Sequence, residues 1–198
     1  MNEDLIQKFG FSEMYEWSTL PEPNIKFGRF VQFDESNPGK IKLCSNCSNI
    51  VGVTTINSVI DSDNPAEWPG KNIANEYGDI YLQRERLAVG NKEYDQNAEM
   101  AYIRTKMWEH LIPINNPAYK ENIQYVKRSN RQEWVRVNLL GKCIVEDDGK
   151  CIPGQYCTLY TGKMKQKLGT VKPATDKSEV KFYVLKRLTQ KTILILNK

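Results

Sequence analysis

The sequence predicts a mainly β fold of the β-rich α+β kind, built from small barrel or meander cassettes with few short helices. Short runs rich in β-branched and aromatic residues recur along the chain, and clusters of Gly, Pro, Asn and Asp separate them. Residues 26–34 alternate side chains as a strand does, and residues 34–40 follow as a turn. Residues 40–44 and 49–56 add two short strands, which together predict a small meander or a barrel edge.

The middle of the chain carries weaker patterns. Residues 62–72 have the composition of a loop, and residues 75–90 predict a turn followed by a long strand. Within that segment, residues 81–87 are also compatible with a helix. Residues 98–112 show a partial helical periodicity of apolar side chains, and they belong to the least predictable stretch, residues 91–121.

The last third of the chain again predicts strands. Residues 133–146 form a long apolar-rich run, and residues 147–150, with the sequence Asp-Asp-Gly-Lys, predict a hairpin turn. A strand that enters a turn is expected at 154–163, and two strands joined near Gln190 are expected within 180–198. The final run, 192–197, is nearly all apolar, so we expect it to be buried on both faces or in a subunit interface.

Size, charge and apolar content limit the function classes. The 198 residues fit one domain, 1–198, with a lead-in segment at 1–10 and the domain body at 11–198. The net charge is only +4 and both signs are mixed along the chain, which argues against nucleic acid as a partner. No apolar run is long enough to cross a bilayer, and the N-terminus has no secretory signal. We therefore expect that the protein is made in a cytoplasm and is not inserted into a membrane.

The sequence offers little for metal or cofactor chemistry. It lacks a phosphate-binding glycine loop and a serine nucleophile elbow, and its one histidine, His110, lies in what resembles the end of an amphipathic helix. Cys44 and Cys47 form a Cys-x-x-Cys pair, which keeps a weak zinc alternative open. The other cysteines are Cys143, Cys151 and Cys157. We expect no cofactor, no metal site and buried structural thiols.

Ordered motifs along almost the whole chain resemble one family. Five segments match motifs of this family in the same order. They are FSEMYEW at 11–17, GRFVQFD at 28–34, EWPGKNIANEYGDI at 67–80, the block from Asn116 to Cys157 and YVLKRLTQKTILIL at 183–196. The family is the intramolecular-chaperone autoproteolytic domain found at the C-termini of phage neck-appendage and tailspike proteins, and it is classed as a self-cleaving glutamic peptidase. The residues that carry the structural signature are Trp17, Trp68, Arg128, Arg131, Glu133, Trp134, Gly141, Asp148 and Gly149.

The resemblance implies an intertwined homotrimer that aligns three chains before a long fibre folds. A chaperone role of this kind is physically reasonable. β-Fibres are dominated by non-local contacts, which form slowly, and a domain that associates first raises the local concentration of the other chains. The chain begins at Met1, so we expect a stand-alone structural protein of a virion, made in the host cytoplasm. Its partners are expected to be copies of itself and other virion or fibre proteins.

The alternative function is an active self-cleaving endopeptidase that cuts once near its own N-terminus. The resemblance makes Glu13 and Glu16 the candidate acids, and Ser12 is a candidate nucleophile. The family cuts at a Ser-Asp bond, but the aligned bond here is Phe9–Gly10, and the nearest similar bond is Ser12–Glu13. No histidine or lysine flanks Ser12 to accept its proton. From the sequence alone we therefore expect the cleavage to be absent or vestigial.

The signature block also predicts a structural ion pair. Arg128, Arg131 and Glu133 lie just before Trp134, and arginine is the cation that best tolerates partial burial. We expect at least one bidentate arginine–carboxylate pair beside this tryptophan.

Overall fold

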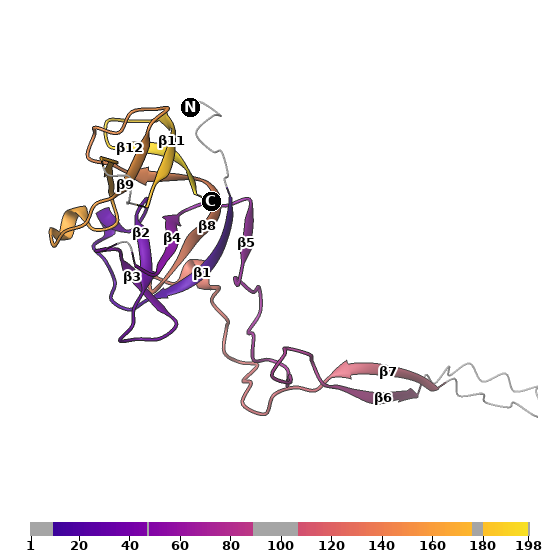
Figure 1. Ribbon diagram of the computed structural model, residues 1–198. Helices are drawn as coiled ribbons and strands as arrows, with labels where there is room; N and C mark the ends of the chain where they lie inside the picture. The colour runs from indigo at the N-terminus through magenta and orange to yellow at the C-terminus, as the bar shows by residue number, and fades with distance from the viewer. Residues whose placement is uncertain (1–9, 47, 89–106, 176–179, 198) are drawn as a thin grey trace, which may run out of the picture. The chain divides into compact units, whose positions relative to one another are not determined.

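In the computed structural model, the described residues are 10–46, 48–88, 107–175 and 180–197, and they form the mostly β protein that the sequence predicted (Figure 1). Within these ranges no α-helix occurs, and the helical turns are the 3-10 segments η2 (Pro23–Ile25), η3 (Arg128–Asn130) and η4 (Lys165–Lys167). The strands are β1 (Phe11–Trp17), β2 (Phe30–Phe33), β3 (Lys40–Leu43), β4 (Ile50–Thr55), β5 (Ile60–Ser62), β6 (Leu82–Ala88), β7 (Met107–Pro113), β8 (Trp134–Glu146), β9 (Tyr156–Leu159), β10 (Val171–Pro173), β11 (Phe182–Arg187) and β12 (Thr192–Asn197). Most of the predicted lead-in, up to Phe9, lies outside the described residues.

The chain divides into two compact units. Unit 1 takes in the described residues up to Ala66 and those from Val126 onward, and unit 2 is Glu67–Tyr125. The assignment of residues 1–198 to one domain stays a prediction. None of the described residues belongs to a helix that is long and apolar enough to span a membrane.

Five strands of unit 1 close into a ring (Figure 1). β8 runs antiparallel to both β1 and β4, β2 runs antiparallel to β4 and β3, and β3 returns in parallel to β1. One core cluster joins strands of this ring and consists of Trp17, Val31, Ile41, Val135 and Val137. The ring is the small barrel that the sequence predicted, and its closure leaves these strands with paired edges.

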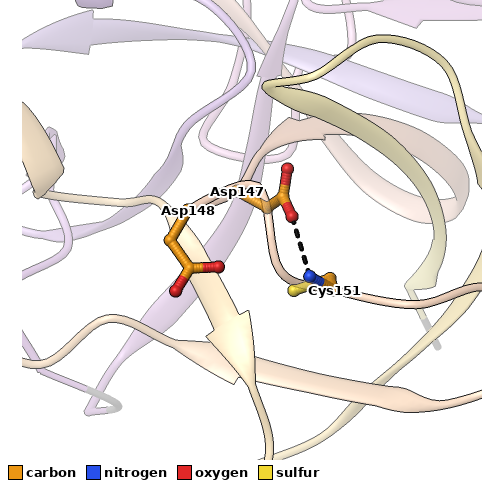
Figure 2. Close-up of side chains that lie close together, drawn as sticks. All are labelled: Asp147, Asp148 and Cys151. Atoms are coloured by element: carbon orange, nitrogen blue, oxygen red, sulfur yellow. Dashed lines mark hydrogen bonds between the residues drawn. The ribbon is translucent and has the colours of Figure 1, made fainter.

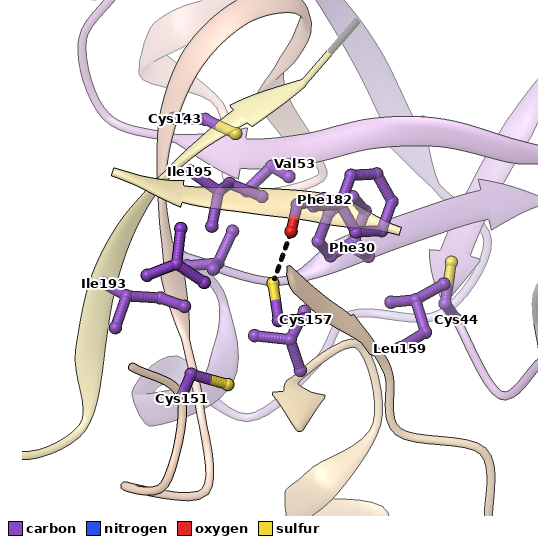
Figure 3. Close-up of a cluster of buried hydrophobic side chains, with 13 residues drawn as sticks. Phe30, Cys44, Val53, Cys143, Cys151, Cys157, Leu159, Phe182, Ile193 and Ile195 are labelled. Atoms are coloured by element: carbon purple, nitrogen blue, oxygen red, sulfur yellow. Dashed lines mark hydrogen bonds between the residues drawn. The ribbon is translucent and has the colours of Figure 1, made fainter. Parts of the chain in front are cut away.

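β8 is long enough to serve two sheets. Its first half completes the barrel, and its second half pairs with β12, which continues through β11 and β9 to β10. A second core cluster lies between these strands and the barrel, and in it the rings of Phe30 and Phe182 pack with centroids 4.5 Å apart (Figure 3). Both apolar clusters therefore depend on one continuous strand.

Gly141 lies where β8 passes from the barrel to the second sheet. Its φ of +99° is in the left-handed region that favours glycine. A Cβ at this position would lie 3.2 Å from the Cα of Gly10, so the chain before β1 could not pack as closely. The signature glycine therefore has a physical role, since β8 bends there and admits the backbone of another segment.

The last strand is central in its sheet. β12 lies between β11 and β8, and Ile193 and Ile195 are fully buried in the core. Leu194 and Leu196 alternate with them and remain half-buried on the opposite face. We expected both faces of this strand to be buried, and within the single chain only the face of Ile193 and Ile195 is fully buried.

The predicted hairpin at residues 147–150 is wrong. The segment does turn, with Gly149 at φ +84° and the Lys150 amide donating to the Asp148 carboxylate at 3.1 Å. However, β8 pairs with β12, whereas the following strand β9 pairs with β10 and β11. The turn is therefore a connection between strands that are not neighbours.

In unit 2, the helix predicted within residues 98–112 is wrong where the residues are described. Residues 107–113 form strand β7, which pairs antiparallel with β6 over seven residue pairs, from Leu82 opposite Pro113 to Ala88 opposite Met107. His110 thus lies on a strand and not at the end of a helix, and residues 98–106 lie outside the described residues. Only the backbone is described for residues 85–88 and 107–110. The long strand expected within 75–90 is confirmed as β6.

A charged network fixes the end of β1 to the turn between β2 and β3. The Asp34 carboxylate accepts hydrogen bonds from the Ser18 hydroxyl, from Asn37 Nδ2 at 2.8 Å and from Lys42 Nζ at 2.9 Å. These donors, led by Ser18, hold the pKa of the Asp34 carboxyl well below its usual range. Because the ionised form is favoured in the folded protein, Asp34 stabilises the fold at neutral pH.

Asp34→Asn is expected to lower the melting temperature at pH 7 and to flatten its acid dependence. The depressed pKa means that the stabilisation is present above the unfolded carboxyl pKa of about 3.9 and is lost as pH falls below it. Thermal unfolding between pH 2 and pH 7 measures both effects, with Glu22→Gln on an exposed loop as the control. Parallel wild-type and Asp34→Asn curves would contradict the prediction.

Candidate functional site

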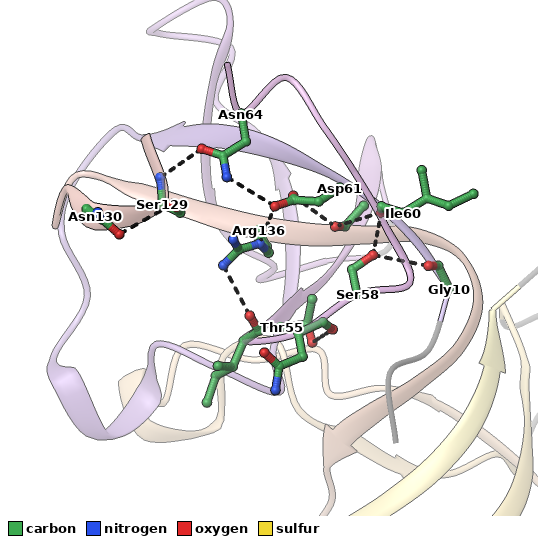
Figure 4. Close-up of polar contacts among 12 residues, drawn as sticks. Gly10, Thr55, Ser58, Ile60, Asp61, Asn64, Ser129, Asn130 and Arg136 are labelled. Carbon is green, nitrogen blue, oxygen red and sulfur yellow. Dashed lines mark hydrogen bonds and ion pairs between the residues drawn. The ribbon is translucent and has the colours of Figure 1, made fainter. Parts of the chain in front are cut away.

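The opening strand β1 is held on both sides at its first residues. Phe11, Ser12 and Glu13 pair in parallel with Ile60 to Ser62 of β5, and the same strand pairs antiparallel with β8. The β1–β8 register shifts between Phe11 and Ser12, which is a bulge at the point where the chain enters the domain. The candidate site is built around this entry point (Figure 4).

Ser12 is fully buried and faces the carboxylate of Asp61. Its hydroxyl lies 3.4 Å from the Ile60 carbonyl and 3.4 Å from Oδ1 of Asp61. Asp61 in turn accepts from Arg136 Nε at 2.8 Å and from Asn64 Nδ2 at 3.2 Å. Ser12 therefore has a carboxylate beside it, although no histidine or lysine flanks it in the sequence.

The carbonyl of Gly10 receives donors from one short turn. The Ser58 hydroxyl lies 3.1 Å from it, the Val59 amide 3.2 Å and the Ile60 amide 3.4 Å. Gly10 has a φ of +71°, and a Cβ there would come within 2.3 Å of Asn138 Nδ2. Only glycine fits this position, which lies immediately before β1.

Glu13 and Glu16 do not converge. They are three positions apart on one strand, so their side chains point to opposite faces. Glu13 accepts a hydrogen bond from the Tyr15 hydroxyl at 3.0 Å, and burial together with this bond raises the pKa of Tyr15 to about 12. Glu16 forms an ion pair with Lys40 at 2.6 Å. The catalytic roles of Ser12, Glu13 and Glu16 stay predictions, but the structure does not assemble the two glutamates as a pair.

The Ser12–Glu13 bond is a poor candidate for cleavage. Both residues lie within β1 and pair with β5 on one side and with β8 on the other. A nucleophile would have to open this ladder before it could reach the carbonyl carbon. The start of β1 differs in that Gly10 lies before the paired residues, whereas Phe11 still pairs with Ile60 of β5 and Leu140 of β8.

An arginine–carboxylate pair is present beside Trp134, with its partner Asp63 from elsewhere in the chain, and it is made through the single nitrogen Nη1 instead of the bidentate geometry that we expected. Arg128 forms an ion pair with the Asp63 carboxylate, and its guanidinium carbon lies 4.3 Å from the ring centroid of Trp134. Arg131 donates from Nε to the Val126 carbonyl at 2.8 Å. Glu133 contributes its backbone carbonyl, which accepts from the Trp17 amide at 2.8 Å. These signature residues stabilise the segment that leads into β8.

The remaining signature tryptophans have different settings. Trp17 is nearly fully buried in the barrel cluster. Trp68 lies in unit 2 and is 41% exposed, with its ring centroid 6.4 Å from that of Tyr125. Trp17 is therefore a core residue, whereas Trp68 keeps an accessible face.

Asp147, Asp148 and Cys151 gather at the turn after β8, with one possible ligand atom from each within 4.8 Å of the others (Figure 2). The Asp147 carboxylate accepts from Arg187 Nη2 at 2.7 Å and from the Cys151 amide at 3.0 Å. A hydrogen bond with the Cys157 thiol, together with burial, raises the pKa of the Cys151 thiol far above its usual range. The cluster therefore orders the turn through Arg187, and its thiol remains protonated.

The cysteines with described surroundings belong to the core. Cys143, Cys151 and Cys157 are buried in the second apolar cluster, and burial raises the pKa of the Cys143 thiol well above normal (Figure 3). Cys44 is buried in the same cluster, but Cys47 lies outside the described residues. A zinc site at Cys44 and Cys47 thus stays a weak alternative prediction.

A cavity of about 830 Å³ opens on unit 1 beside this turn. Its wall includes Arg29, which forms an ion pair with Glu146, and Lys167. The signature residues Asp148 and Gly149 line it too, but none of the predicted catalytic residues does. The cavity and the entry point of β1 are separate features of the unit.

Sequence reasoning missed Gly10, Ser58, Asp61 and Arg136 as members of one network. Asp61 is 49 residues from Ser12, and Arg136 is 75 residues from Asp61. The segment around Ser58 carries no motif, so only the β1–β5 and β1–β8 pairings reveal the proximity.

Comparison with known proteins identifies relatives. The family model Peptidase_G2, described as the IMC autoproteolytic cleavage domain, matches residues 6–181. The preneck appendage protein of Bacillus phage PZA is 28% identical over 146 residues, which are 73% of this chain and 14% of that protein. The pre-neck appendage protein of Bacillus phage phi29 is 27% identical over 139 residues, again 14% of its length. The chain thus spans a small part of these relatives.

Two solved structures share the fold. The C-terminal fragment of bacteriophage phi29 gene product 12 superimposes with a TM-score of 0.62 and 21% identity, covering 95% of this chain and 99% of that fragment. The pre-mature form of the same gene product gives a TM-score of 0.65 and 21% identity, covering 97% of this chain and 22% of that chain. The architecture described above is therefore that of the C-terminal fragment.

Arg128→Ala is expected to lower the free energy of unfolding by about 1–2 kcal/mol. The change removes a partly exposed ion pair, worth about 0.2–1 kcal/mol, and a cation–π contact of about 0.5–1 kcal/mol. Arg128→Lys keeps the charge but loses the planar stack on Trp134, so an intermediate loss is expected. Chemical denaturation measures these values, with the exposed Lys127→Ala as the matched control. Equal stability of Arg128→Ala and Lys127→Ala would rule out the contact as a stabilising one.

Proposed function

The chain belongs to the Peptidase_G2 family of IMC autoproteolytic cleavage domains, and we propose that it works as the trimerising assembly module of a phage appendage. Its relatives are phage pre-neck appendage proteins, which supports a place in the virion among other appendage or fibre proteins. In this role the domain acts as an intramolecular chaperone that brings three chains together before a long β-rich fibre forms.

The observation that carries this proposal is an apolar face on the second sheet. The ladder places Tyr156, Tyr183 and Leu196 in one row across β9, β11 and β12, and Leu194 and Ile144 in the adjoining row across β12 and β8. Tyr156, Tyr183 and Ile144 are 54%, 38% and 42% exposed, and the two leucines are half-buried. These five residues are called the apolar face below.

A second copy of the chain is the occupant that this face suits. The row ends at Lys142, which is opposite Leu196, and Lys186 lies opposite Leu194, so cations border the apolar centre. Apolar centres with polar rims are typical of protein interfaces. Three copies placed head to tail around an axis would cover the face of each copy in a closed ring.

The proposed order of events follows from topology. The barrel closes through strands of one chain, so a single copy can fold before it meets a partner. The apolar face is then presented on a formed sheet, and association raises the local concentration of any attached fibre segments. The compact domain thus aligns the three chains first, before the long fibre segments lose their conformational entropy.

Ile144→Glu is expected to convert a trimer into a monomer. A carboxylate within the apolar face would lose its hydration on association, at a cost of several kcal/mol, which weakens association by at least about a hundredfold. Light scattering at micromolar concentration measures the mass, and circular dichroism checks that the fold persists. Lys165→Glu on η4 is the matched control and should remain trimeric. A monomeric wild type would refute the proposal.

Self-cleavage near the N-terminus is the second candidate function. The description of the matched family favours it, and so does the position of Gly10, whose carbonyl receives donors from Ser58, Val59 and Ile60 at the entry to β1. The expectation of no cleavage rested on the absence of a Ser-Asp bond at the aligned position and of a histidine or lysine beside Ser12. We retain Glu13, matched to the acid of the family motif, as the candidate acid for this reaction.

Glu13→Gln is expected to remain full length under conditions in which the wild type loses the residues before β1. Glutamine keeps the size of the side chain and can still accept from the Tyr15 hydroxyl, but it cannot transfer a proton. Intact-mass spectrometry over several days and several pH values measures the cut. Glu35→Gln, at an exposed turn, should be cut as the wild type is. If every protein stays intact, the assembly role stands alone.

A further inference from the structure

We propose that the turn Ser58–Ile60 is an oxyanion cradle and that Gly10–Phe11 is the bond this chain cuts. The inference rests on the self-cleaving function proposed above. It assigns a bond and a set of donors that neither the motif alignment nor the side chains near Phe9 indicated.

Three donors converge on the Gly10 carbonyl oxygen. An ordinary parallel ladder supplies one amide to a carbonyl, and here the Ile60 amide at 3.4 Å fills that place. The Val59 amide at 3.2 Å is additional. The Ser58 hydroxyl, at 3.1 Å, is the third donor (Figure 4). Backbone amides and a hydroxyl aimed at one carbonyl oxygen are the donors that stabilise a tetrahedral intermediate in acyl transfer.

The Ser58 hydroxyl can respond to the developing charge. It has one proton, and in this structure it lies between the Gly10 carbonyl and the Ile60 carbonyl as possible acceptors. When negative charge forms on the Gly10 oxygen, that oxygen becomes the stronger acceptor and draws the proton. The interaction is thus stronger in the transition state than in the ground state, which is the condition for catalysis.

The close packing of the site admits only glycine at position 10, the residue on the N-terminal side of the proposed cleavage. Gly10 packs its Cα against Gly141 and lies so close to Asn138 that a Cβ would come within 2.3 Å of the amide nitrogen. The positive φ of Gly10 is in the left-handed region that favours glycine, and it falls on the residue whose carbonyl is held.

The chemistry is hydrolysis with water as the second reactant. The water oxygen forms a bond to the Gly10 carbonyl carbon, and the oxygen of that carbonyl carries the negative charge toward Ser58, Val59 and Ile60. The C–N bond to Phe11 then breaks, and the carbonyl re-forms as the new carboxyl end at Gly10. The proton released by water ends on the Phe11 amine, so no oxidant or cofactor is required.

The test uses the full 198-residue chain and two variants. Intact mass and N-terminal sequencing of the product are followed over time for wild type, Ser58→Ala and Ser36→Ala. We expect a product that begins at Phe11, a cut at least about tenfold slower in Ser58→Ala, because a lost oxyanion donor costs about 10²–10³ in rate elsewhere, and an unchanged rate in Ser36→Ala, on the β2–β3 turn. Melting temperatures check that Ser58→Ala is folded.

The outcomes separate this inference from the two functions it accompanies. A product that begins at Gly10 or Glu13 shows self-cleavage but overturns the assignment of the bond. A folded Ser58→Ala that is cut at the wild-type rate overturns the cradle. A trimer that stays intact overturns both the cradle and the self-cleaving function while leaving assembly in place, and a monomer that yields the Phe11 product supports the cradle but refutes trimerisation.

Discussion

The structure of unit 1 depends on one strand that belongs to two sheets. β8 closes the barrel with its first half and joins β12 with its second half, so both apolar clusters need it in place. The bend at Gly141 allows this double use, because its φ of +99° is easily adopted only by glycine. A shift of β8 by one residue would exchange its buried and exposed faces and disrupt both clusters together.

The same strand couples the N-terminal entry point to the completed fold. Gly10 contacts Asn138 and Gly141 of β8, and its carbonyl is held by the turn at Ser58–Ile60. These partners come from segments about 50 and 130 residues further along the chain, so the proposed cleavage site exists only after the barrel has closed. A cut that waits for folding fits a domain that first assembles its chains and is then separated from them.

The two proposed activities use different strand pairings of unit 1. The apolar face lies over β9, β11, β12 and the second half of β8, whereas the cradle lies where β1 meets β5 and the first half of β8. The buried thiols of Cys143 and Cys151, whose pKa values are raised, belong to the second apolar cluster and have no part in either proposal.

The sequence by itself determined the mostly β class, the family and many of the short strands, because alternation, β-branched content and turn residues are local signals. It located the hairpin of β11 and β12 and the signature Gly141, whose φ and close approach to Gly10 explain the glycine. Only the tertiary structure decided that residues 107–113 form a strand, because their partner β6 overrides a weak helical pattern. It also decided that the turn at 147–150 joins strands that do not pair, that Arg128 takes Asp63 as its partner, and that Ser58 lies beside Gly10. These contacts join residues 48 or more positions apart or depend on the order of strands in the sheet, and neither property is encoded in any short window of sequence.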